Sequence, residues 1–175
     1  ETGMQGDPNH AYQSHYDNVF VHACGTGFHQ QLMADGSLNL GFSATAMHYV
    51  SVKPMEIPTH LHAVCADPES RAAFAQQAAE DWESILLARA AELMPGGRFI
   101  CLNFGIDEKG RYLGNTGGQH MFDQFHQFWL ALFEDGSITA DEYKRASFAQ
   151  YYRTMDEFCA PFSDCLLYTS PSPRD

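Results

Sequence analysis

Basic residues are scarce in this sequence, and the scarcity excludes several kinds of partner. Lysine and arginine together number 10 against 22 aspartates and glutamates, and the formal net charge is −12. A surface of that sign repels phosphate backbones and anionic lipids, so we expect neither nucleic acid nor a membrane as a partner. No apolar run reaches the roughly eighteen residues of a membrane helix, and no signal-peptide pattern opens the sequence. These absences predict a cytoplasmic protein.

Cysteine is present, but not in a pattern that suggests disulfides. The five cysteines are scattered, at positions 24, 65, 101, 159 and 165. Cys101 lies in an apolar run, where a reduced, packed thiol is the ordinary state. With 175 residues and 45% hydrophobic content, the chain predicts a globular domain, or a piece of one, with a core of its own.

Both ends of the sequence look foreign to a complete domain. Residues 1–18 begin with glutamate and show no helical or strand period. Residues 165–175 read CLLYTSPSPRD, which resembles the translation of a sequencing-library adapter, and we exclude them from the fold. We therefore expect a fragment, with a partial domain over residues 1–164.

The middle of the chain has the order of one parallel α/β step. An apolar run at 37–42 predicts a strand, and residues 68–94 have an amphipathic helical period. Pro-Gly-Gly at 95–97 then leads into the apolar run 99–104, a predicted buried strand. This order favours an α/β fold with a doubly wound parallel sheet, whose ligands sit beyond the carboxyl ends of the strands. Ser43, Thr45, His48 and Tyr49 follow the first strand and are candidate ligand-binding residues.

Other segments are less strongly patterned. We expect a short strand at 19–23, a short helix at 44–50 and a turn-rich loop at 105–118. An aromatic helix is predicted at 119–134. A further helix should follow Ser137, with Thr139 and Glu142 at capping-box spacing.

Four blocks of this sequence occur in a familiar order: TGFH at 26–29, SATAMHYVS at 43–51, PGG at 95–97 and YYRTMDE at 151–157. Together they resemble the plant-type (SABATH) carboxyl methyltransferases, which methylate acids such as salicylate, benzoate and jasmonate with S-adenosylmethionine. The resemblance spans roughly residues 19–162. It implies a Rossmann-like class I methyltransferase fold, truncated at the N-terminus, with an α-helical cap over about 119–157 and homodimers as a common assembly.

The resemblance also implies roles for individual residues. Gly27 and Phe28 correspond to the pair that contacts the adenosyl group, although Gly27 offers only its backbone where the family has a hydroxyl. His48 and Tyr49 correspond to a His-Trp pair that holds the substrate's carboxylate. Tyrosine replaces the indole N–H with an O–H donor. Together with Thr45 they are the expected substrate-binding residues.

Parts of the family's machinery are missing from this sequence. Ala146 and Ala149 stand where some members have an Asp and an Asn near a magnesium ion, so we predict no such metal. The glycine-rich turn and the acidic ribose-binding residue are expected upstream of Glu1. No catalytic base is required, since a carboxylic acid with a pKa of about 4 is already ionised.

Several alternatives remain open. The same fold serves N- and O-methyltransferases, and a catalytically inactive binding or dimerisation fragment also fits the departures at Gly27 and Tyr49. The aromatic residues of the 119–134 segment suit a hydrophobic core as well as a lid over substrate. His60, His62 and Cys65 have a spacing that could ligate zinc, but no second pair of ligands follows at a familiar distance.

Overall fold

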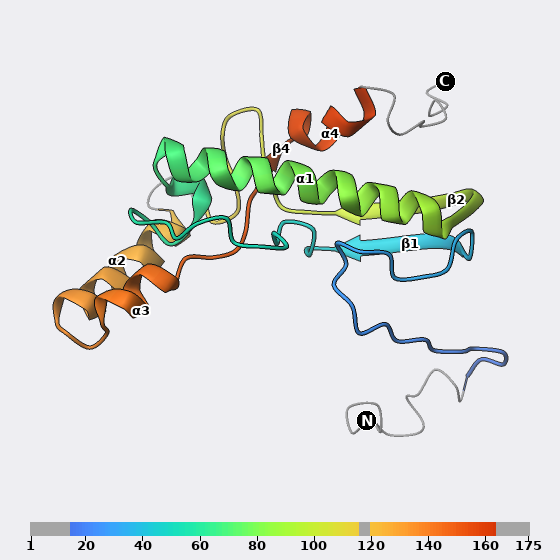
Figure 1. The fold of residues 1–175 in the computed structure, drawn as a ribbon, viewed down its shortest axis with the longest axis horizontal. Helices are drawn as coiled ribbons and strands as arrows, with labels where there is room; N and C mark the ends of the chain where they lie inside the picture. Colours follow the sequence, from blue (N-terminus) through green and yellow to red (C-terminus); the bar gives the residue numbers. More distant parts are fainter. Residues whose placement is uncertain (1–14, 116–119, 164–175) are drawn as a thin grey trace.

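The computed structural model describes residues 15–115 and 120–163. Its centre is a parallel α/β unit in which β1 (Leu38–Ala44) leads to α1 (Pro68–Glu92), and α1 leads to β2 (Leu93–Leu102). The two strands pair in parallel, with Gly41 opposite Phe99 and Ala44 opposite Leu102. Helix α1 lies along one face of this sheet (Figure 1). The predicted parallel step is therefore confirmed.

Helix α1 forms where its local signals predict it. The carboxylate of Asp67 accepts the N–H of Ser70, and Pro68 opens the first turn, where a missing N–H costs nothing. Phe74, Ala78, Trp82, Ile85 and Leu86 are buried along one side of the helix. The helix ends two residues earlier than predicted because Leu93 begins β2, so β2 also starts well before Phe99.

Two predicted elements are wrong. Residues 19–23 form no strand, and Phe20 is 80% exposed; an apolar run becomes a strand only beside a partner, and none of the described residues pairs with it. Residues 44–50 form a turn and not a helix. Ala44 still belongs to β1, and Thr45 has φ 54°, a left-handed conformation that no α-helix contains.

The second half of the chain builds a cap. Helix α2 (Met121–Glu134) and helix α3 (Ala140–Arg145) lie together beyond the carboxyl ends of β1 and β2 (Figure 1). Both helices were predicted, and so was the capping box between Thr139 and Glu142. The chain then returns to the core through β4 (Arg153–Thr154), which pairs in parallel with β3 (Gly105–Ile106), and ends its described part in α4 (Met155–Ser163). The pairing of β3 with β4 was not predicted.

The two faces of the β1–β2 sheet differ in their cover. Phe99 and Cys101 pack against Trp82 and Ile85 on the side of α1. On the other face, Leu40 and Phe42 are 57% and 63% exposed, and Ile100 and Leu102 beside them are exposed as well.

Two further expectations can be checked on the described residues. Cys24, Cys65, Cys101 and Cys159 are free thiols, as expected; Cys165 lies outside the described part of the chain. None of the helices described is both long and apolar enough to span a bilayer.

Candidate active site

The turn that follows β1 holds three of the predicted site residues. The N–H of Thr45 donates to the carbonyl of Leu102 at 2.8 Å, which continues the pairing with β2 by one residue. The positive φ of Thr45 then turns the chain, and a bond from the N–H of Tyr49 to the carbonyl of Ala46 closes the turn. His48 and Tyr49 are thus held at the carboxyl end of a parallel strand, where such sheets bind ligands.

A second segment, distant in sequence, pairs with this turn. The N–H of Val50 donates to Ala149, and the N–H of Tyr151 donates to the carbonyl of His48 at 2.8 Å. Tyr49 and Gln150 form an isolated antiparallel bridge. The chain that leaves the cap is therefore joined to the His48 turn by backbone hydrogen bonds.

Between the turn and the cap lies a cavity of about 360 Å³, here called the cap cavity. Its polar side chains come from the turn and its bridging partner, whereas its apolar wall comes from α2 and neighbouring segments. It is lined by Thr45, His48, Tyr49, Phe104, Leu113, Met121, Phe122, Phe125, Phe148, Gln150 and Tyr152. The three predicted substrate-binding residues therefore face one cavity, as expected for residues that act together.

His48 is buried in this wall and is uncharged near neutral pH. Its Nδ1 lies 3.0 Å from Oδ1 of Asn103. Burial lowers the pKa of His48, the contact with Asn103 opposes that shift, and the positive charge of Arg153 lowers the pKa further. A neutral imidazole has one N–H donor and one acceptor nitrogen.

Tyr49 is more accessible than its neighbour. It is 46% exposed, and its ring lies 4.6 Å from that of His48, centroid to centroid. Tyr152 closes another side of the cap cavity, and burial raises the pKa of its hydroxyl to about 12, so it is a neutral donor.

Gly27 and Phe28, the predicted cofactor neighbours, belong to a turn on the other side of residues 45–49. Phe28 borders a second cavity of about 360 Å³, here called the Phe28 cavity, whose wall includes Ser43, Ala46 and Met47. The side chain of His29 hydrogen-bonds the carbonyl of Tyr49 at 3.0 Å and so links the two turns. Gly27 itself does not line the Phe28 cavity; its carbonyl accepts the N–H of Gln30.

A buried ion pair fixes the turn that carries Phe28. Arg89 and Glu92, near the end of α1, form two hydrogen bonds of 2.7 Å with each other. Arg89 also donates to the carbonyls of Phe28 and Gln30, and Glu92 accepts the N–H groups of Leu32 and Met33. Residues 28–33 are therefore attached to α1 by their backbone.

The aromatic residues of α2 divide between two environments. Phe122 and Phe125 line the cap cavity, and Phe122 is also buried against Val64 and Tyr152. Phe128 is 68% exposed, and Trp129 donates to the carbonyl of Tyr143 in α3. Of the aromatic residues predicted to form a lid, those near the N-terminus of α2 therefore line the candidate site.

The possible zinc ligands come together only in part. His60 and Cys65 lie with Asp123, with ligand atoms within 4.8 Å of one another, whereas His62 is buried against Phe122. Nδ1 of His60 accepts the N–H of His62, so neutral His60 carries its proton on Nε2, which lies 3.2 Å from Asp123. Three protein ligands are one fewer than a structural zinc site uses, and a metal at this cluster would have to displace the Nε2 proton.

Sequence reasoning missed Asn103, Gln150 and Tyr152 as neighbours of the candidate site. Asn103 had a readable signal, because it is the polar residue that interrupts an apolar strand run at its carboxyl end. Tyr152 lies in the YYRTMDE block of the resemblance, which gave it no role, and Gln150 had no signal, since only the long return from the cap brings it to the turn.

Comparisons with known proteins bear on the family and the fold of this chain. No curated protein matches the chain. Among solved structures, "Loganic acid methyltransferase with SAH" superposes with a TM-score of 0.74 at 18% identity, over 97% of this chain and 51% of that one. The chain therefore spans about half the length of that protein, and the likeness shows a class I methyltransferase fold over the part that is covered. A family model described as SAM dependent carboxyl methyltransferase matches residues 5–168. The chain belongs to the S-adenosylmethionine-dependent carboxyl methyltransferase family.

Proposed function

We propose that this chain carries the acceptor side of a methyltransferase that moves a methyl group from S-adenosylmethionine to the carboxylate of a small organic acid. The observation that carries the proposal is the position of residues 45–49 between two cavities. Thr45, His48 and Tyr49 line the cap cavity, whereas Ala46 and Met47 line the Phe28 cavity. A transfer enzyme needs donor and acceptor sites side by side, so that the reacting atoms can come into contact.

The cap cavity suits an acid with an apolar body. Phe104, Phe122 and Phe125 supply apolar surface to its lining, and His48, Tyr49 and Gln150 supply hydrogen-bonding groups. Small-molecule sites commonly combine a largely apolar lining with a few placed polar groups. The solved relative supports this class of substrate, because its name gives it a carboxylic acid.

The chemistry places modest demands on the protein. S-adenosylmethionine supplies an already activated methyl group when it is bound. A carboxylate is the ionised form of the acid at neutral pH, so its oxygen attacks without a general base. We assign to His48 and Tyr49 the task of orienting the carboxylate through N–H and O–H donors. The cap residues exclude water and hold the body of the acid in line.

We assign the cofactor side to the turn at Gly27 and Phe28. The Phe28 ring borders an apolar cavity, and an aromatic face of this kind can stack with adenine. Gly27 contributes through its backbone. The hydrogen bond from His29 to Tyr49 would keep this turn in a fixed position relative to the substrate residues.

The test is a comparison of acceptor classes. The longest reading frame that contains these residues is incubated with methyl-labelled S-adenosylmethionine and a panel of small aromatic and terpenoid acids. Each acid is paired with its amide, which has nearly the same shape but no charge. We expect label in the methyl esters and none in the amides. Transfer to amine or heterocyclic nitrogen with no transfer to any acid would overturn the proposal in favour of N-methylation.

A further inference from the structure

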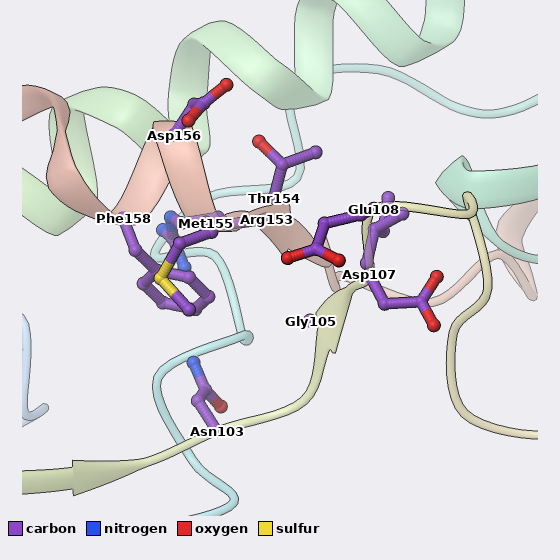
Figure 2. Close-up of a pocket in the computed structure, with 10 residues that line it drawn as sticks. Asn103, Gly105, Asp107, Glu108, Arg153, Thr154, Met155, Asp156 and Phe158 are labelled. Carbon is purple, nitrogen blue, oxygen red and sulfur yellow. The ribbon is translucent and has the colours of Figure 1, made fainter.

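Two buried hydrogen-bond donors near His48 have no partner among the described residues. They are Nδ2 of Asn103 and Nε of Arg153. Buried donors are almost always paired in folded proteins, so these two unpaired donors require an explanation. Both residues line the same cavity of about 550 Å³ on the α4 side of β2, and the Asn103 nitrogen points toward the side where Arg153 lies (Figure 2).

The other nitrogens of Arg153 are already committed. Nη1 donates to the carbonyl of Met47 at 2.7 Å, and Nη2 donates to the carbonyl of Ala78. Arg153 is 2% exposed, and its guanidinium lies near the rings of Trp82 and Phe158. An amide nitrogen facing such a cation places a donor against a positive charge, which is the unfavourable orientation of a side-chain amide.

A half-turn of the Asn103 amide removes this conflict. Before the turn, Oδ1 of Asn103 lies 3.0 Å from Nδ1 of His48. After the turn, Nδ2 occupies that position beside Nδ1, and the amide oxygen faces the guanidinium. The two orientations have the same shape, so the hydrogen-bond network decides between them. In the turned orientation Asn103 donates to Nδ1, and neutral His48 must carry its proton on Nε2.

We infer that Asn103 is a positioning residue for His48. Arg153 orients the amide of Asn103, and the amide holds His48 in the tautomer that has its proton on Nε2. The Nε2–H group can then donate to an acidic ligand in the cap cavity. The inference rests on the proposed function for the identity of that ligand. If the amide of Asn103 is not turned, Nδ1–H of His48 donates to Oδ1 of Asn103, and Nε2 carries no proton. The lone pair of Nε2 would then face the lone pairs of a carboxylate oxygen, which is a repulsive contact. A carboxylate therefore needs the turned amide.

The tautomer can be measured without any catalytic activity. Long-range ¹H–¹⁵N correlation spectra of the full chain, labelled with ¹⁵N-histidine, distinguish a protonated ring nitrogen from a bare one. His62 is an internal reference, because its Nδ1 accepts the N–H of Val64 and its proton must therefore lie on Nε2. We expect His48 to show the same pattern as His62. A proton on Nδ1 of His48 would overturn the inference.

Two variants extend this test. Asn103→Asp offers only acceptor oxygens, so we expect Nδ1 of His48 to gain a proton that it lacks in the parent protein. If the parent already carries that proton, the spectrum will not change and the inference fails. Asn39→Asp, at an exposed asparagine of β1, is the matched control and should leave the His48 signals unchanged.

Kinetics separate this inference from the proposed function. If the parent transfers methyl groups to acids, Asn103→Leu should raise KM for the acid about tenfold or more and leave KM for S-adenosylmethionine unchanged. Equal KM values for the acid in parent and variant would reject the positioning role while the proposed function stands. If no acid is methylated but His48 is protonated on Nε2, the proposed function fails while the tautomer assignment stands.

Discussion

Replacing Glu92 with glutamine should weaken the attachment of the turn that carries Phe28 to α1. Glu92 is 1% exposed, and its carboxylate is the counterion of Arg89, which is itself buried. In Glu92→Gln the shape of the side chain is kept, but the buried guanidinium loses its charge partner. Removing one member of a buried ion pair costs about 3–5 kcal/mol.

The loss of stability in Glu92→Gln should lie near the lower end of that range. Arg89 keeps two acceptors in the variant, the carbonyls of Phe28 and Gln30, at 2.9 and 2.8 Å. Glutamine also keeps one oxygen that can accept the N–H of Met33. We therefore expect the free energy of unfolding to fall by about 3 kcal/mol.

Urea denaturation followed by circular dichroism measures this loss. Glu80→Gln, at an exposed position of the same helix, is the matched control and should change stability by less than about 0.5 kcal/mol. A Glu92→Gln loss no larger than that of the control would refute the reasoning.

The pH dependence of the same pair has a definite sign. Burial would raise the pKa of Glu92, but hydrogen bonds from Arg89 and from the N–H groups of Leu32 and Met33 outweigh it and hold the pKa below its ordinary value of 4.5. A carboxyl whose pKa is depressed by folding stabilises the protein above its unfolded value, and that stability is lost as the pH falls through the folded value. The parent should therefore lose stability below about pH 4.5 through this group, whereas Glu92→Gln should lack that part of the acid response.

Three further predictions concern the rest of the chain. Phe122→Ala should cost about 3–5 kcal/mol in urea denaturation, whereas Phe128→Ala, at an exposed site of the same helix, should cost less than about 1 kcal/mol; equal losses would contradict the assigned burial. Hydrogen bonds from the backbone and hydroxyl of Ser70 lower the pKa of Asp67 from 3.8 to about 2. The N-terminus of α1 should therefore lose stability as the pH falls from 3.8 toward 2, as measured by exchange of the Ser70 amide, and Asp67→Asn should abolish that dependence. Thr139→Ala should remove the capping box of α3 at a cost of about 1 kcal/mol, which thermal denaturation detects; no change in the midpoint would argue that α3 forms without its cap.

The parts of this fold that were predictable have signals within a few residues. Helix α1 has an N-cap at Asp67, a proline in its first turn and a clear apolar period, and α3 has its capping box. The parallel pairing of β1 with β2 followed from the order of the elements. Local information was sufficient for these elements because their caps and their apolar periods lie within the elements or directly beside them.

The errors come from contacts between distant residues. Alanine and methionine at 44–50 favour a helix, but pairing with β2 extends the strand to Ala44 and turns the chain at Thr45. The two-residue strands β3 and β4 exist only because each supplies the other's partner across almost fifty residues of sequence. Asn103 reaches His48 in the same way, through the register of two strands.

The candidate site was predicted in part. The resemblance singled out Thr45, His48 and Tyr49, and the structure brings all three to one cavity. It brings Phe28 to a neighbouring cavity and leaves Gly27 outside it. Their roles in binding remain predictions, because proximity to a cavity defines a possible site and not its ligand.

The most direct test of the central claim is the ratio kcat/KM for a methylated acid in His48→Leu, which removes the ring donor, measured on the longest reading frame that contains these residues. A hydrogen bond to a charged group contributes about 1.5–3 kcal/mol, so its loss should lower kcat/KM roughly 10- to 150-fold. His22→Leu, at an exposed histidine, should match the parent. Turnover of every tested acid at the parental rate in His48→Leu would contradict the assignment of the cap cavity as the carboxylate site.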